Sequence, residues 1–146
     1  VQTTEGGKPH LACLSSRPFT KAALQDFFGA STVLPLTVVS DGLACFTVAE
    51  SLGAVHDREI TGSGKASVLN EKFQAVNTLI GNLKTALSGT YHAVKFAKYA
   101  YRYLAEAQFR FNRRYDLRAI LGSLVRAAVA TPKMPERGIR VAEVHR

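Results

Sequence analysis

Residues 36–42 read Leu-Thr-Val-Val-Ser-Asp-Gly, a short apolar and β-branched run that stops at a turn. β-Branched residues favour strands, and Pro35 interrupts the apolar run that begins at Val33, so a strand is predicted over 36–40. Asp and Gly are typical turn residues, which places the carboxylate of Asp41 on a tight turn at the carboxyl end of this strand. Asp41 is therefore either a site carboxylate or an ordinary turn residue.

The segments around this strand alternate between strand-like and helix-like patterns. The predicted elements are a hairpin with strands at 1–4 and 10–16, a helix capped by Thr20, a helix over 43–52 that closes on Gly53, a strand over 54–60 and a loop over 61–70. Strands that alternate with helices predict a mixed sheet with helices packed on it. Ligands bind such open sheets at the carboxyl ends of strands, and Asp41 occupies one of these ends.

The second half of the chain has helical periodicity. An apolar stripe runs along a predicted helix from Glu71 to Gly89, and it consists of Phe73, Val76, Ile80, Leu83 and Leu87. A longer helix is predicted over about 94–113, with a buried side formed by Phe96, Ala100, Tyr103, Leu104, Ala107 and Phe111. A last helix is capped by Asp116, runs to about 130, and buries Leu117, Ile120, Leu121, Leu124 and Ala128.

Positive charge is concentrated in this helical half. The chain has 146 residues and a formal net charge of +8. Residues 1–70 hold five Lys and Arg against six Asp and Glu, a net of −1, whereas 71–146 hold fourteen against five, a net of +9. Such asymmetry favours a polyanionic partner, and nucleic acid is the usual one for a cytoplasmic chain. The alternative is that Lys and Arg only keep the helices soluble.

Composition and local patterns exclude several other classes. With 47% hydrophobic and 21% charged residues the chain can form a core. Its longest apolar runs fall short of the roughly 18 residues of a membrane helix, and the residues from Val1 onward lack the basic-then-apolar pattern expected of a secretory signal. Cys13 and Cys45 stand far apart and form no metal-binding spacing, which fits two reduced cysteines in the cytoplasm. No membrane and no small-molecule substrate is therefore expected.

Asn77 is the second candidate site residue. It lies on the predicted 71–89 helix beside the apolar stripe, and Gly81 and Lys84 share its face. This face offers a polar oxygen, a gap at Gly81 and a cation that can meet a phosphate, although an Asn at the edge of a stripe is otherwise an ordinary boundary residue. His56 and His92 are candidates to line the same cleft, and for His56 a structural role is the alternative.

Five motifs together resemble a known family. They are Val-Val-Ser-Asp-Gly-Leu-Ala-Cys-Phe at 38–46, Val-Asn-Thr-Leu-Ile-Gly-Asn-Leu-Lys at 76–84, Gly-Thr-Tyr-His-Ala at 89–93, Tyr-Leu-Ala-Glu at 103–106 and Arg-Phe-Asn-Arg-Arg at 110–114. In this order and at these spacings they resemble the ISXO-like group of bacterial insertion-sequence transposases over almost the whole chain. The resemblance implies an RNase H-like core with an acidic triad in which Asn replaces the Glu in part of the group. Asp41 matches the second acid and Asn77 the third position.

The resemblance also implies a metal-dependent reaction on DNA. Strand cleavage and transfer exchange one oxygen for another at phosphorus, and carboxylate-held Mg²⁺ or Mn²⁺ stabilises both oxygens. Asp41 and the side-chain carbonyl of Asn77 are suitable ligands for such ions. The first Asp of the pattern would lie upstream of the hairpin, so the expectation is a C-terminal part of a transposase that lacks its first strand and is inactive alone, with metal bound only in the intact enzyme.

The expected architecture is therefore an α/β chain with an RNase H-like mixed sheet, flanking helices and a missing first strand, over 1–93, followed by a helical extension over 94–146. The residues expected to contact DNA are Lys84, Arg102, Arg110, Arg113 and Arg114. The alternative for the arginines is a helix-terminal role, with Glu106 pairing Arg102 or Arg110. Insertion-sequence ends, target DNA and a homo-oligomer are the candidate partners. A non-catalytic DNA-binding remnant and an RNase H-like nuclease are the alternative functions.

Overall fold

A pair of parallel strands organises the first half of the chain. The computed structural model describes residues 1–3, 8–60, 62, 68–90 and 96–141. Strand β3 (Thr37–Ser40) pairs in parallel with β4 (Val55–Arg58), with Val38 opposite His56 and Ser40 opposite Arg58. Val38 and Ser40 are buried whereas Thr37 and Val39 are exposed, which is the alternation of a half-buried strand. The strands predicted at 36–40 and 54–60 are confirmed, each slightly shorter than expected.

The connection between these strands is a broken helix. The continuous helix predicted over 43–52 is wrong, because the structure has a 3₁₀ turn η1 (Ala44–Thr47) followed by the single α-helical turn α2 (Val48–Ser51). The hydroxyl of Thr47 donates to the carbonyl of Ala44 at 2.9 Å, and this local bond competes with the α-helical pattern. Gly53 has a φ of 85° and ends the helix, as predicted.

Helix α1 (Lys21–Ser31) covers this connection and completes the core. Its N-cap is Thr20, whose side chain accepts the N–H of Ala23, as predicted. Helix α1 packs against η1 and α2. The core cluster consists of Phe28, Val38, Val48 and Ala49, with Leu24, Leu36, Phe46, Leu52 and Ala54 packed around it.

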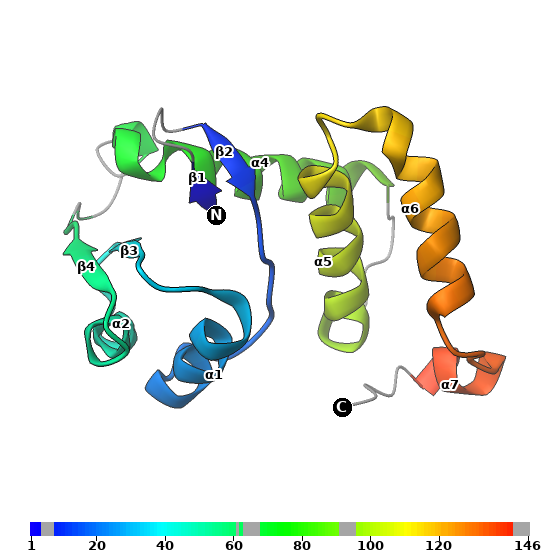
Figure 1. The fold of residues 1–146 in the computed structure, drawn as a ribbon, viewed down its shortest axis with the longest axis horizontal. Coiled ribbons are helices and arrows are strands. Elements are labelled where there is room, and N and C mark those ends of the chain that lie inside the picture. Colours follow the sequence, from blue (N-terminus) through cyan, green and yellow to red (C-terminus); the bar gives the residue numbers. More distant parts are fainter. Residues whose placement is uncertain (4–7, 61, 63–67, 91–95, 142–146) are drawn as a thin grey trace.

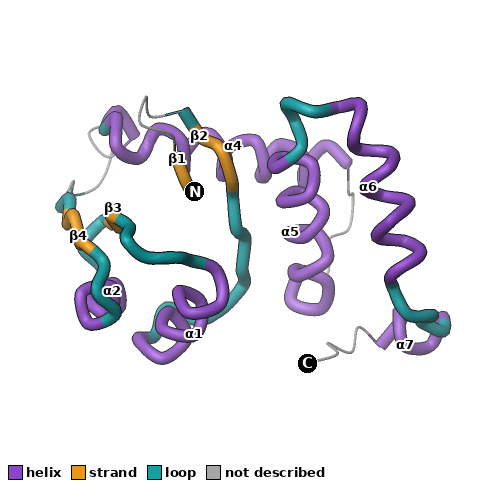
Figure 2. Tube along the Cα trace, in the orientation of Figure 1, coloured by secondary structure: helices purple, strands orange, loops and turns teal. Residues whose placement is uncertain are grey.

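The N-terminal hairpin forms a sheet of its own. Strand β1 (Gln2–Thr3) pairs in an antiparallel manner with β2 (Pro9–Leu11), so the predicted hairpin is confirmed in shorter form. The described residues therefore contain two separate two-stranded sheets, and the single mixed sheet expected from the sequence is not seen. The reason lies in residues 12–14, which continue β2 and hydrogen-bond to side chains of a helix in place of β3. Figure 2 shows this segment as a loop that leads from β2 to α1.

Four helices form the rest of the described chain: α4 (Glu71–Thr90), α5 (Phe96–Asn112), α6 (Leu117–Ala130) and α7 (Glu136–Val141). Helix α5 contacts β2 and stands between the two-sheet half and α6 (Figure 1). On α4 the buried residue is Leu79, whereas Ile80, which the sequence assigns to the stripe, is 43% exposed. The stripe is rotated by one residue there, since Val76, Leu79, Leu83 and Leu87 also have helical spacing.

Helix α6 departs most from its prediction. Asp116 caps it by accepting the N–H of Ala119, as expected. However, Leu117 and Leu121, predicted to be buried, are each 70% exposed, and Leu124 and Ala128 are exposed as well. The helix lies at the outer edge of the molecule (Figure 1), where the described elements pack little against it. No helix in the described part of the chain is both long and apolar enough to cross a bilayer.

Candidate functional site

Asp41 lies immediately after β3, at the carboxyl end of the parallel pair. Its side chain is exposed, and Oδ1 accepts the N–H of Leu43 at 3.3 Å. Gly42 has a φ of 89°, and a Cβ atom there would lie 3.1 Å from Ile60 and 3.2 Å from Nε of Arg58. The positive φ favours glycine at this position, and the nearby side chains of Arg58 and Ile60 would have to shift slightly to admit a larger residue. Within the described residues Asp41 takes part in no ion pair.

A chain of polar side chains, buried at Ser40 and His56, lies directly behind this turn. Oγ of Ser40 is 2.8 Å from Nε2 of His56, and Nδ1 of His56 is 3.3 Å from Oε1 of Glu50 on α2. The side chain of His56 is 1% exposed, so both ring nitrogens are occupied by protein groups rather than open to a cleft. This geometry favours the structural role that the sequence left open for His56. His92 lies outside the described residues.

Two further carboxylates lie at the same edge and are held by a lysine. Nζ of Lys72, in the first turn of α4, is 2.8 Å from Oδ2 of Asp57 and 2.7 Å from Oε2 of Glu59. The N–H of Glu59 donates to the carbonyl of Ser40, so the backbone of Glu59 lies beside the residue that precedes Asp41. The sequence pattern did not predict this cluster of Lys72, Asp57 and Glu59. The only signal for it was the alternation of acidic and basic residues at Asp57, Arg58 and Glu59.

The Lys72 cluster gives a testable pH dependence. Its hydrogen bonds, first to Asp57 and then to Glu59, raise the pKa of Lys72 from 10.5 to about 12. Because this pKa is higher in the folded chain than in the unfolded one, the stabilisation is complete below pH 10.5 and is lost as the pH rises through about 12. In Lys72→Met we expect lower stability than wild type below pH 10.5, with the difference closing between pH 10.5 and 12.

Thermal unfolding followed over this pH range is the measurement, and Lys84→Met is the matched control. Lys84 is exposed on the same helix and has no carboxylate partner within the described residues. A difference between wild type and Lys72→Met that stays constant up to pH 12 would contradict the assignment.

Asn77 is half-buried on α4, five residues beyond Lys72. Five residues of α-helix correspond to about 140° around the axis, so the two side chains leave α4 in different directions. No hydrogen bond joins Asn77 to Asp41 in the part of the chain that the structure describes. The described residues also contain no group of three or more His, Cys, Asp or Glu side chains that could hold a metal ion. The convergence of Asp41 and Asn77 stays a prediction.

Arginines on α5 and just after it lie against aromatic rings. The guanidinium of Arg113, one residue beyond α5, lies 4.0 Å from the ring centre of Phe109. That of Arg102 lies 5.4 Å from the ring centre of Tyr101 and also donates to the Tyr101 hydroxyl at 2.7 Å and to Sδ of Met134 at 3.6 Å. Arg110 pairs with Glu106 at 3.5 Å, which is one of the ion pairs that the sequence left open. Rings that hold a guanidinium from one side leave its charge available to an anion on the other.

Arg114 differs from these residues because protein groups surround its guanidinium. It donates to the backbone carbonyls of Phe111 at 2.6 Å, His10 at 3.4 Å and Pro9, and it lies 3.7 Å from the ring centre of Phe111 and 4.2 Å from that of Tyr115. Two neighbours on α5 continue the same attachment. Asn112 accepts the N–H of Ala12 at 2.7 Å and donates to its carbonyl at 2.9 Å, and Gln108 accepts the N–H of Leu14 at 2.8 Å. Polar side chains of α5 thus satisfy backbone groups of residues 12–14 that a neighbouring strand would otherwise bond.

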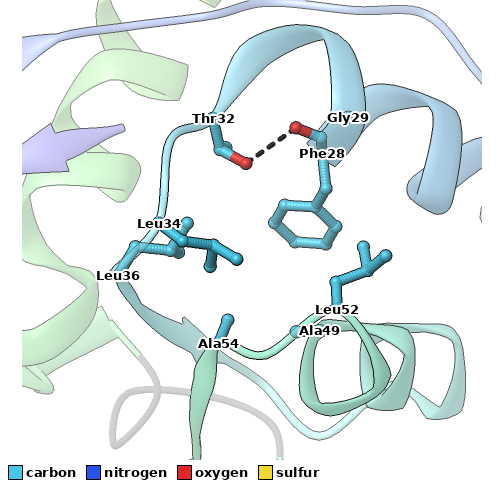
Figure 3. Close-up of a pocket in the computed structure, with 8 residues that line it drawn as sticks. All are labelled: Phe28, Gly29, Thr32, Leu34, Leu36, Ala49, Leu52 and Ala54. Carbon is cyan, nitrogen blue, oxygen red and sulfur yellow. Dashed lines mark hydrogen bonds between the residues drawn. The ribbon is translucent and has the colours of Figure 1, made fainter.

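A shallow apolar pocket of about 150 Å³ lies elsewhere, between α1, α2 and the segment before β3 (Figure 3). Its lining consists of Phe28, Gly29, Thr32, Leu34, Leu36, Ala49, Leu52 and Ala54. None of these side chains is ionisable, and the hydroxyl of Thr32 already donates to the carbonyl of Phe28 at 2.7 Å. The pocket therefore offers no group for acid–base or metal chemistry.

The sequence of the chain matches a known protein family. Residues 16–112, more than half of the chain, match a transposase domain. The matching model is the ISXO2-like transposase domain, and the chain belongs to this family, as the motifs predicted. The matched range includes both Asp41 and Asn77. No curated protein and no solved structure matches the chain.

Proposed function

We propose that this chain supplies part of the catalytic core of a transposase that cleaves and joins DNA, with Asp41 as a carboxylate of the reaction site. The observation that carries the proposal is the position of Asp41. Its exposed side chain, free of any ion pair in the described residues, stands at the carboxyl end of β3, inside the matched transposase domain. Ligands of open parallel sheets bind at this end.

The proposed arrangement has two parts. Residues 1–93 contribute to an RNase H-like core in which β3 and β4 are neighbouring parallel strands, and 94–146 form a helical extension with a basic face. The parallel pairing of β3 with β4 and the packing of α1 beside it support the first part. The concentration of cations on α5 supports the second, because a fixed row of positive charge attracts the phosphates of DNA.

Transposases of this type generally use divalent metal ions, and we propose Asp41 and Asn77 as oxygen donors for Mg²⁺ or Mn²⁺. These residue types suit the ion, because hard cations prefer carboxylate and carbonyl oxygens. The described residues assemble only part of such a site, since Asp57 and Glu59 are held by Lys72 and no three-carboxylate group is present among them. Asp41 is accordingly assigned one ligand position and no reaction step.

Mn²⁺ binding tests the role of Asp41 directly. We expect added Mn²⁺ to broaden the amide signals of residues 40–43 in an NMR titration, because a paramagnetic ion at Asp41 relaxes nearby protons. Asp41→Asn should remove most of this effect. Asp26→Asn is the matched control, since Asp26 is an exposed aspartate on α1. Equal broadening in wild type and Asp41→Asn would show that Asp41 is no metal ligand.

Cations on α4, on α5 and just after α5 test the DNA role. Lys84, Arg110 and Arg113 are proposed to meet phosphates, together with Arg102. Replacing the first three by Ala should reduce the slope of log K against log salt concentration by about 3 for duplex DNA, because each phosphate contact contributes about 0.9. Lys21→Ala on α1 should leave the slope unchanged. An unchanged slope in the triple variant would favour the purely structural interpretation of these cations.

A second candidate function is non-catalytic DNA binding. It is favoured by the incomplete metal-ligand set among the described residues. We expect the purified chain to shift insertion-sequence ends in a mobility assay without nicking or joining them in Mg²⁺ or Mn²⁺. Asp41-dependent nicking by this chain would eliminate the non-catalytic candidate, and absence of a shift would contradict both candidates.

A further inference from the structure

The geometry points to a positioning role for His56: its buried ring joins the exposed carboxylate of Glu50 to buried Ser40 in a hydrogen-bonded relay that fixes the turn carrying Asp41. This inference rests on the proposed function, because it assigns the relay a purpose only if Asp41 acts at the site. The three side chains come from α2, β4 and β3, so the relay crosses the parallel pair. It ends at the backbone of Gly42, whose N–H donates to Oγ of Ser40 at 3.3 Å.

The chemistry of the partners determines which group donates and which accepts in each hydrogen bond of the relay. A carboxylate can only accept, so Nδ1 of His56 carries the proton and donates to Glu50. In the neutral ring this leaves Nε2 as an acceptor, and the hydroxyl of Ser40 donates to it. The oxygen of Ser40 then has lone pairs free for the N–H of Gly42. Both ring nitrogens of His56 and the hydroxyl of Ser40 have partners, and no buried side-chain N or O of the described residues lacks one.

The same three residue types form nucleophilic triads in hydrolases, but burial excludes that chemistry here. Ser40 is 3% exposed, and its oxygen accepts a backbone N–H while its proton is held by His56. A nucleophile must reach the reacting atom of a substrate. Ser40 faces the interior behind the turn, whereas the exposed group at this edge is Asp41. The relay therefore supports the carboxylate and does not itself attack.

Two residues of strand β4 fix the backbone of Gly42, one at its N–H and the other at its carbonyl. His56 and Arg58 are two residues apart, so they lie on the same face of the strand. His56 reaches the N–H of Gly42 through Ser40, and Nη2 of Arg58 donates to the carbonyl of Gly42 at 3.2 Å. Fixing both backbone polar groups of Gly42 limits the positions that the preceding Asp41 carboxylate can take. Positioned ligands bind and react better than mobile ones, because less freedom is lost on binding.

Hydrogen exchange of single amides tests the relay without DNA or metal. In His56→Leu we expect the Gly42 and Leu43 amides to exchange about tenfold faster, because one hydrogen bond contributes roughly that factor. Amides in the middle of α1 and α5 should change less than about twofold, since local opening does not require global unfolding. His56→Gln should restore slow exchange, because its amide can still bond to Ser40. Unchanged Gly42 and Leu43 exchange, or a Gln variant as fast as Leu, would overturn the relay.

Glu50 provides a second variant for the case in which His56→Leu unfolds the chain. The Glu50 side chain is 65% exposed, so its loss leaves no cavity. Glu50→Ala should speed Gly42 exchange by about threefold and Glu50→Gln should not, because only the latter keeps an acceptor for Nδ1. Equal exchange in the two Glu50 variants would contradict the relay. If the exchange results hold but Mn²⁺ does not bind near Asp41, the relay stands and the proposed function fails.

Discussion

Phe28→Ala is expected to lower the free energy of unfolding by about 3–4 kcal/mol, the largest effect of any single substitution considered for this chain. Phe28 is 9% exposed and packs from α1 against Val38 of β3 and against Val48 and Ala49 of α2. Its ring thus joins the three elements that place the Asp41 turn. Truncation removes the buried area of a large aromatic ring and leaves a void between these elements.

The surroundings of Phe28 place the expected loss of stability toward the lower end of the range for replacing a buried Phe by Ala. Phe28 also lines the shallow pocket (Figure 3), so the void opens to an existing hollow and neighbouring side chains can partly fill it. The helix end is unaffected, because Thr32 bonds to the backbone carbonyl of residue 28 and not to the ring. Even so, a loss of about 3 kcal/mol is a large share of the 5–15 kcal/mol that is typical of whole domains.

Urea unfolding followed by far-UV circular dichroism measures this effect. Phe19→Ala is the matched control, since Phe19 precedes the same helix but is 73% exposed. The control should change stability by less than about 0.5 kcal/mol. A Phe28→Ala midpoint that coincides with the control would show that the cluster around Phe28 is not the core of this half.

The features that the sequence predicted correctly depend on residues close to one another along the chain. Thr20 and Asp116 cap helices because a short polar side chain reaches the N–H three residues later in any context. The strand before Asp41 and the turn at Gly42 are likewise set by β-branched residues followed by Asp-Gly. The family assignment was also predictable, because motifs in a fixed order need no knowledge of packing.

What the sequence did not predict depends on distant partners. The mixed sheet failed because Asn112 and Gln108, about a hundred residues away in the chain, satisfy the backbone after β2. Leu79 and Ile80 lie about 100° apart around α4, but each stands three or four residues from both Val76 and Leu83, so periodicity fits either one and only tertiary packing decides which is buried. The apolar residues of α6 show the same limit: their spacing predicts a buried side, yet the described elements leave Leu117 and Leu121 exposed.

Arg114→Ala is expected to lower the free energy of unfolding by about 2–3 kcal/mol, because its bonds to backbone carbonyls and its two ring contacts are lost together. The carbonyls of Pro9 and His10 would also lose their charged donor. Arg110→Ala is the matched control. Arg110 is exposed and forms a surface ion pair with Glu106, so its loss should cost less than about 0.5 kcal/mol.

The two arginines should also separate in DNA binding. Arg110→Ala should reduce the slope of log K for DNA binding against log salt concentration by about 0.9 and leave the stability unchanged. Arg114→Ala should lower the stability, whereas the molecules that remain folded should bind DNA with an unchanged slope. Arg114→Lys should behave like Arg114→Ala, because a single ammonium can neither reach several carbonyls nor stack as a planar group. If instead Arg114→Ala kept full stability and lowered the slope, Arg114 would be the DNA contact that its place in the Arg-Phe-Asn-Arg-Arg motif predicts. The attachment of residues 9–14 to α5 would then have to rest on Asn112 and Gln108 alone.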